Sequence, residues 1–225
     1  MHSSVLVAAL ACCQAVVAAP TEGPAYGHPS YSPAHIPCDD HSCSHHDPYS
    51  GYEAKSYIDK FDDLPQSIIS LSPVKKYGGL NYKAFFSATP SKLTGPQPHS
   101  PSNVVAYGAY GSLLQGAPIL SPIESNSIFD LHSFYFGCAI NTAETAAGVP
   151  STCTVTVTGY DGTRKIGSEE FKFTPEGILD LKPDFQLAEF GKWAKGMTSA
   201  EFETSNGLLT GTLLDDFAYT VYTKE

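Results

Sequence analysis

Six side chains that can bind soft metal ions lie within twelve residues near the N-terminus. Histidine nitrogen and cysteine sulfur are ligands that zinc and copper prefer, so this cluster is a candidate metal site. In an oxidising compartment the two thiols pair with each other, and the remaining histidines lack a packed environment to orient them. We therefore favour a small disulfide loop over a metal site. The residues are His35, Cys38, His41, Cys43, His45 and His46.

Catalytic motifs of several enzyme classes are absent from the sequence. It contains no Gly-x-Ser-x-Gly elbow, no His-Glu-x-x-His motif, no glycine-rich phosphate loop and no Cys-x-x-Cys pair. His132 lies within an expected strand, where a structural role is more common than that of a general base. Two carboxylates facing a cleft would suit a glycosidase or a lyase, but the sequence selects no pair from Glu169, Glu170, Glu201 and Glu203.

The N-terminus is typical of a secretory signal peptide. Residues 1–19 form a short apolar run that contains no Asp, Glu, Lys or Arg and ends in small residues. A membrane span needs about 20 apolar residues with flanking anchors, so a cleaved signal is the better interpretation. We expect a secreted, extracellular protein without a membrane span.

The charge balance excludes polyanionic partners. The chain has a formal net charge of −10 and only 13 lysines and arginines, all of which lie beyond the signal. Phosphate backbones and anionic lipid surfaces attract basic proteins, so we expect no nucleic-acid partner and no anionic membrane partner. The oligomeric state does not follow from these features.

Four cysteines remain after the signal, an even number that favours disulfides in an oxidising compartment. Four cysteines allow three pairings. The pairing that is local in the sequence joins Cys38 to Cys43 and Cys138 to Cys153.

Composition divides the mature chain into two parts. Residues 20–56 are rich in Pro, His, Gly, Ser and Tyr and have almost no aliphatic side chains, which predicts a disordered arm. Residues 57–225 alternate short β-rich runs with turn clusters. The clearest strand starts at Cys153, where valines and threonines alternate, and a turn at 160–163 followed by Phe171 and Phe173 predicts a hairpin.

The fold expected for residues 57–225 is an all-β antiparallel sandwich of the jelly-roll type. No long segment has helical periodicity, and 187–195 is compatible with either a short helix or a strand. The other strand candidates are 67–71, 80–86, 103–110, 128–138, 201–204 and 213–223.

Four short segments resemble secreted, carbohydrate-binding-module-like jelly rolls of the galactose-binding-like type, which include many fungal and bacterial extracellular proteins. The segments are 61–64 (FDDL), 77–82 (YGGLNY), 129–135 (FDLHSFY) and 214–219 (LDDFAY). The resemblance implies a structural calcium shared by acidic residues near the first strand and the last strand. Its ligands would come from Asp62 or Asp63 and from Asp215 or Asp216, although paired aspartates are also common as charges on strand ends.

Sugar binding in such a domain depends on exposed aromatic rings that stack on pyranose rings. The candidates are Tyr77, Tyr82, Tyr107, Tyr110 and Trp193. Each ring can equally serve as a core or cross-strand partner.

The favoured hypothesis is a secreted, non-catalytic binding protein that contacts a glycan or an extracellular protein surface. The alternatives are a small secreted hydrolase or lyase that acts on polysaccharides and a host-directed secreted effector. A deep cleft with two facing carboxylates would favour the enzyme, whereas exposed aromatic rings without such a cleft would favour the binding protein.

Overall fold

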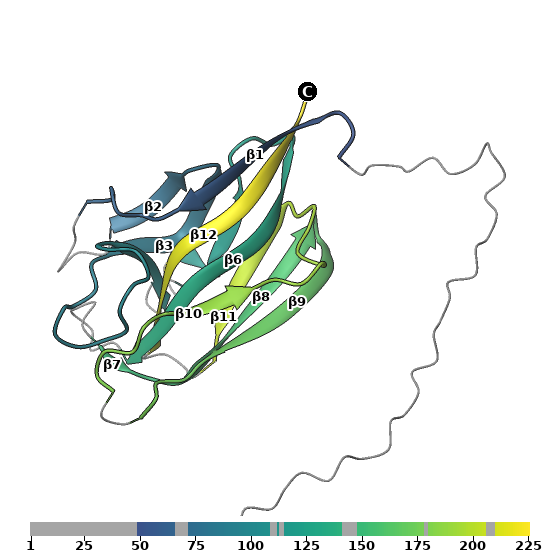
Figure 1. Cartoon of the computed structure of the whole chain (residues 1–225). Helices are drawn as coiled ribbons and strands as arrows, with labels where there is room; N and C mark the ends of the chain where they lie inside the picture. The colour runs from purple at the N-terminus through teal and green to yellow at the C-terminus, as the bar shows by residue number, and fades with distance from the viewer. Residues whose placement is uncertain are drawn as a thin grey trace, which may run out of the picture. The chain divides into compact units, whose positions relative to one another are not determined.

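The computed structural model describes residues 49–65, 72–108, 112, 115–140, 148–177, 180–205 and 210–225. All of them belong to the compact unit His46–Glu225. The fold is all-β, and every pairing between its strands is antiparallel (Figure 1). The strands are β1 (Tyr52–Asp59), β2 (Ser72–Tyr77), β3 (Leu80–Ala88), β4 (Val104–Gly108), β5 (Ile119–Pro122), β6 (Ser127–Ile140), β7 (Val149–Pro150), β8 (Cys153–Asp161), β9 (Arg164–Phe173), β10 (Gln186–Glu189), β11 (Ser199–Thr204) and β12 (Thr210–Lys224).

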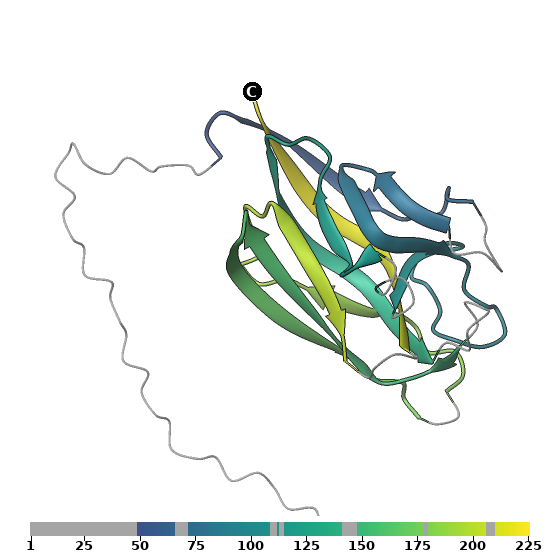
Figure 2. The same cartoon turned by 180° about the vertical axis from the view of Figure 1, so that it is seen from behind.

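The strands form one hydrogen-bonded sheet that curls into a sandwich-like fold. Its order is β10-β6-β12-β4-β3-β5-β11-β8-β9, with β1 added to β12, β2 added to β3 and β7 added to β6. The view from behind shows β8, β9 and β11, in green to yellow-green, lying together on the other side of the fold from β1 and β12 (Figure 2). The all-β antiparallel prediction is confirmed.

Alternation of apolar and polar side chains produces the buried core. Along β8 the residues Val155 and Val157 are fully buried, whereas the threonines between them are partly exposed. Because successive side chains on a strand point to opposite faces, each strand delivers one face to a common interior. Aromatic rings dominate that interior, and Phe134 of β6 has ring contacts with Phe136, Phe171, Phe190, Phe202 and Phe217.

The predicted hairpin is confirmed, because β8 pairs with β9 from Cys153 opposite Phe173 to Asp161 opposite Arg164. Gly162 closes the turn with a φ of 60°, in the left-handed region that glycine adopts at low cost. Most other strand candidates coincide with strands, and 187–195 begins with the last three residues of β10. The candidate 67–71 lies outside the described residues.

The domain starts earlier than the composition suggests. Strand β1 begins at Tyr52 and pairs with β12 over its whole length. Before it, the Tyr49 hydroxyl donates to Asp130 of β6 at 2.9 Å. Residues 52–56, whose composition resembles that of the arm, therefore form part of the sheet.

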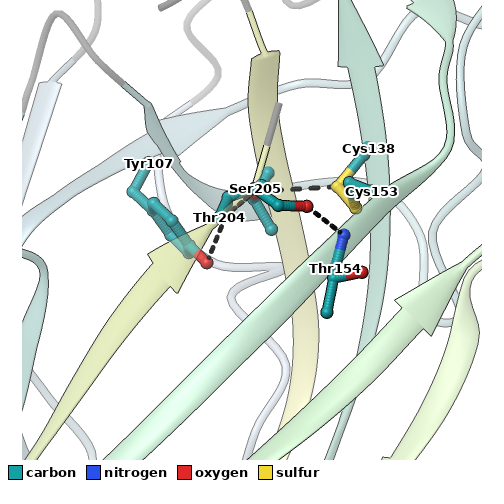
Figure 3. Close-up of a disulfide and its surroundings, with 7 residues drawn as sticks. Tyr107, Cys138, Cys153, Thr154, Thr204 and Ser205 are labelled. Carbon is teal, nitrogen blue, oxygen red and sulfur yellow. Dashed lines mark hydrogen bonds between the residues drawn. A yellow bond between two sulfur atoms is a disulfide. The ribbon is translucent and has the colours of Figure 1, made fainter. Parts of the chain in front are cut away.

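A disulfide joins Cys138 near the end of β6 to Cys153 at the start of β8, with their Cα atoms 6.2 Å apart (Figure 3). Both cysteines are buried, and the Thr212 side chain of β12 lies beside the Cys138 sulfur at 3.7 Å. Next to the bond, the Ser205 hydroxyl accepts a hydrogen bond from the Thr154 N–H at 2.9 Å. This half of the predicted pairing is confirmed, whereas Cys38 and Cys43 lie outside the described residues.

No helix in the part of the chain that the structure describes is long and apolar enough to cross a membrane.

Candidate functional site

Strands β10, β6, β12 and β1 lie side by side (Figure 1). Their face turned away from the aromatic core carries polar side chains. We call it the outer face. On β6, Phe129, Leu131, Phe134 and Phe136 enter the core. Asp130, His132 and Tyr135 stand between them, as Thr220 and Tyr222 do on β12, so these side chains belong to the outer face.

A bulge interrupts the outer face in the middle of β12. The strand pairs with β4 at 211–214 and with β1 at 217–224, so its neighbour on one side changes at Asp215 and Asp216. The pairing with β6 shifts register at the same place. Asp216 has a φ of 47°, which is uncommon for a residue with a side chain. Bulges of this kind re-aim side chains and are frequent beside functional sites.

The change of neighbour alone can explain the unusual backbone. Strand β3 pairs with β5 at 80–83 and with β4 at 86–88, and Ala84 between them has a φ of 61°. Ala84 has no polar or ionisable side chain, so a positive φ at such a point is a feature of the fold. The bulge in β12 becomes a candidate site because it carries two carboxylates.

The Asp215 carboxylate is fully buried and surrounded by donors. Its Oδ2 accepts the Ser100 backbone N–H at 2.7 Å, and its Oδ1 accepts the Asp216 N–H at 2.8 Å. The Ser100 hydroxyl donates to Oδ1 as well, at 3.1 Å. Asp215 therefore holds the segment before β4 against β12.

The Asp216 carboxylate holds a histidine ring. Its Oδ2 lies 2.5 Å from His99 Nδ1, and the His99 ring stacks on Tyr135 of β6 with centroids 3.7 Å apart and planes 8° apart. The His99 side chain is 49% exposed, whereas Tyr135 packs against a small apolar cluster that includes Phe185 and Leu213. Stacking on Tyr135 therefore fixes one face of the His99 ring, and Asp216 fixes one edge, while the rest of the ring remains open to solvent. We call His99 with Tyr135 beneath it the ring platform.

One oxygen of the site has no partner. Asp216 Oδ1 is buried and makes no hydrogen bond within the described residues. An unsatisfied buried acceptor costs about 1 to 3 kcal/mol, so the bulge lowers the free energy of unfolding of the domain.

A second polar group continues the outer face along β6, β12 and β1. His132 Nε2 lies 2.9 Å from the Thr220 hydroxyl, which lies 3.0 Å from the Ser56 hydroxyl. His132 occupies a bulge of its own, because Leu131 pairs with Tyr219 and Ser133 with Ala218. Beyond it, Asp130 accepts the Gly196 N–H at 2.8 Å and the Tyr49 hydroxyl, and is buried.

Burial raises the pKa of the Asp215 carboxyl to about 6, to which the Asp216 charge contributes, while hydrogen bonds from Ser100 and Asp216 act in the opposite direction. Burial also raises the pKa of Asp59, despite hydrogen bonds from the hydroxyls of Tyr219 and Tyr82. These two carboxyls therefore keep their protons in the folded state to a higher pH than in the unfolded chain.

This difference predicts how stability depends on pH. The folded chain binds more protons than the unfolded chain above about pH 4, where an unfolded aspartate ionises, and up to about pH 6, where folded Asp215 does. The contribution of Asp215 is complete below that window and is lost as the pH rises through it, by up to about 1.4 kcal/mol per pH unit. Urea unfolding at intervals from pH 4 to 7 should show a weaker decline in Asp215→Asn than in the wild type. Asp161→Asn, an exposed control, should keep the wild-type slope, and equal slopes in all three proteins would contradict the prediction.

Two of the predicted sugar-stacking residues are buried. Tyr82 is 1% exposed and donates its hydroxyl to Asp59 at 2.8 Å, and Tyr107 is 5% exposed and accepts from the Thr204 hydroxyl at 2.8 Å. A buried ring offers no face to a sugar. The prediction is wrong for Tyr82 and Tyr107, which belong to the core.

The other stacking candidates lie apart from the outer face. Tyr77 is half-buried, packs on Phe61 and donates its hydroxyl to Asp63. Trp193 is half-buried against Gly167, donates its Nε1–H to Glu169 at 2.8 Å and contacts Phe190. Both rings therefore have structural contacts, and Tyr110 lies outside the described residues.

The two pairs of aspartates proposed for calcium differ in burial and in hydrogen-bond partners. Asp62 and Asp63 are exposed, Asp215 and Asp216 are buried, and the described residues contain no group of three His, Cys, Asp or Glu side chains arranged to hold a metal ion. Calcium requires oxygen lone pairs, whereas both Asp215 oxygens already face N–H donors. Calcium bound by Asp62 or Asp63 together with Asp215 or Asp216 stays a prediction.

Sequence reasoning missed His99 and Tyr135. His99 lies in a proline- and serine-rich segment, 117 positions from the aspartate that holds it. Nothing in the local sequence joins the two, although an isolated histidine in a loop between predicted strands is a signal worth testing.

Comparisons with known proteins leave the function open. No protein-family model matches the chain, and no curated protein matches it. Among solved structures, the chain is similar to a DUF4465 family protein from Bacteroides caccae, with a TM-score of 0.49 and 11% identity over 76% of this chain and 100% of that chain. A likeness of this degree carries no argument about function.

Proposed function

We propose that the chain is a secreted, extracellular binding protein that contacts a glycan through the outer face and does not turn it over. The observation that supports this proposal most strongly is the ring platform, a half-exposed histidine ring fixed by stacking on Tyr135 and by the Asp216 carboxylate. A ring held in place before binding loses little conformational freedom when a ligand covers it, which favours affinity.

Other polar groups of the outer face suit a ligand rich in hydroxyl groups. The Ser56 hydroxyl and the His132 ring are exposed on the outer face, and each can donate or accept, while the buried Thr220 hydroxyl lies between them and links them. A flat aromatic surface bordered by such groups is the usual way in which proteins bind neutral sugars. The acidic balance of the chain favours neutral glycans over sulfated or uronate polymers.

The contacts of Ser100 support a non-catalytic role. In a serine nucleophile system the hydroxyl donates to the histidine that activates it. Here the Ser100 hydroxyl donates to Asp215, and His99 contacts Asp216 instead. The serine and the histidine are therefore not connected in the way that acyl transfer requires.

One observation favours the alternative of a polysaccharide-acting enzyme. The contact between His99 and Asp216 resembles the orientation of a general base by a carboxylate. Release of new reducing ends or unsaturated products that stops in Asp216→Asn, with folding retained, would replace the binding proposal by this one.

The proposal is tested by titrating the protein with soluble hexasaccharides, one each of cellulose, chitin and β-1,3-glucan type, in an isothermal calorimeter. His99→Ala should weaken binding by about tenfold or more, because a stacked ring contributes about 1 kcal/mol or more. Tyr160→Ala, which removes a half-buried ring from β8, is the matched control and should bind like the wild type.

Binding should also survive 1 M salt, at which the Debye length is about 3 Å and surface ion pairs are screened. Equal affinities of His99→Ala and Tyr160→Ala, or the absence of binding to all three sugars, would contradict the proposal.

A further inference from the structure

We propose that binding at the ring platform is linked to protons: the ligand is held more tightly at acidic pH and is released as the pH rises toward 8. This inference rests on the proposed function and adds its regulation. It assigns Asp216 as the residue that positions His99 and Asp215 as the group that makes this positioning depend on pH.

The bulge in β12 places two carboxylates next to each other in the interior. Asp215 and Asp216 are consecutive and buried, with relative exposures of 0% and 8%. The ion pairs within the described residues are His99 with Asp216 and Arg164 with Asp161, so no lysine or arginine of this part of the chain neutralises the bulge. Buried carboxylates without a cationic partner are costly and are neutralised by protons instead.

The segment before β4 and the strands β6, β4 and β1 surround the two carboxylates. The segment before β4 supplies His99 and Ser100, β6 supplies Tyr135 opposite Asp215, and β4 supplies uncharged Val105 opposite Leu214. Strand β1 supplies Asp59 opposite Phe217, and the Asp59 carboxylate is engaged by the hydroxyls of Tyr82 and Tyr219. Among these elements, His99 is the titratable base in contact with the bulge.

Protonation therefore decides how firmly the ring is held. When Asp215 carries a proton, it exerts no charge repulsion on Asp216, and the Asp216 carboxylate holds the ring through Oδ2. When Asp215 loses that proton, two adjacent buried carboxylates repel each other. This repulsion weakens the contact between Asp216 and His99.

Asp216 is the side chain that moves when the two carboxylates repel each other, because one of its oxygens has no hydrogen bond within the described residues. Asp215 is anchored by backbone N–H donors on both oxygens, whereas Asp216 has His99 on one oxygen and no partner on the other within the described chain. Repulsion between the two is relieved most easily by a movement of Asp216 toward solvent. That movement would release the His99 ring from its edge contact.

The test measures the affinity for the three hexasaccharides from pH 5 to 8 in buffers of different ionisation enthalpy, which also reports proton uptake on binding. The wild type should bind about tenfold more weakly at pH 8 than at pH 5 and take up protons on binding. Asp216→Asn should bind weakly at every pH, and Asp215→Asn should lose part of the pH dependence. Asp161→Asn, the exposed control, should keep the wild-type profile.

A second readout needs no ligand. In carbon-13-labelled protein, the carboxyl resonance assigned to Asp215 should titrate between pH 5 and 7, and the His99 ring resonances should respond to Asp216→Asn. Binding that is independent of pH, or an Asp215 resonance that does not move in this range, overturns this inference and leaves the proposed function intact. Absence of binding at every pH overturns both.

Discussion

Replacement of Phe134 by alanine is expected to lower the free energy of unfolding by about 3 to 5 kcal/mol, the range for large aromatic residues removed from well-packed cores. Phe134 is fully buried, and its ring meets rings from β9, β11 and β12 as well as Phe136 of its own strand. It therefore joins both ends of the curled sheet, and the surrounding rings are too rigid to fill the space that it leaves.

Urea unfolding followed by tryptophan fluorescence gives this loss directly, since the chain has one tryptophan. Tyr160→Ala, which removes a half-buried ring on β8, should cost less than about 1 kcal/mol. A similarly small loss for Phe134→Ala would show that the two parts of the sheet do not share one core.

Removal of the Cys138–Cys153 bond is expected to cost about 3 kcal/mol. The bond closes a loop with a sequence separation of 15, and the chain-entropy model assigns about 3 kcal/mol to a loop of about that length. The double variant Cys138→Ala and Cys153→Ala should unfold at a clearly lower urea concentration, with some further loss because both positions are buried.

Reduction of the wild type with dithiothreitol, compared with reduction of the double variant, separates the bond from the packing of its sulfurs. The reductant should destabilise the wild type and leave the double variant unchanged. Free thiols at both positions in peptides from unreduced protein would refute the disulfide.

Local sequence patterns predict the strands whose two faces differ. Valines and threonines alternate along β8, and the hairpin to β9 follows from that pattern and from a glycine turn. The pairing of Cys138 with Cys153 follows because the two cysteines flank one connection between strands. These features depend on residues that lie close together in the sequence, so one sequence is enough to predict them.

The candidate site depends on contacts that no local pattern encodes. Asp215 and Asp216 stand out in the sequence, but their partners are the backbone of Ser100 and the ring of His99, more than 110 positions away. The strand order that brings them together has β12 between β6 and β4. The sequence alone therefore leads to calcium, the role that the resemblance implies for the paired aspartates, because it does not display their hydrogen-bond donors.

The exposure of aromatic rings also cannot be predicted from the local sequence. Tyrosine is a residue type that suits a sugar-binding surface, yet the rings of Tyr82 and Tyr107 are both buried. Their hydroxyls form hydrogen bonds with Asp59 and Thr204. Tyrosine is common both in β cores and on their surfaces, so its type alone does not give its exposure. On the outer face, the His99 ring is half-exposed and is supported by Tyr135.

The most direct test of the outer face as a glycan-binding surface is a chemical-shift map of the nitrogen-15-labelled protein at pH 5 with each of the three hexasaccharides. The account predicts shifts that concentrate on His99, Tyr135, His132 and Thr220 of the outer face and leave β8 and β9 unchanged. Shifts confined to β8, β9 or the surroundings of Trp193, with none on the outer face, would contradict it.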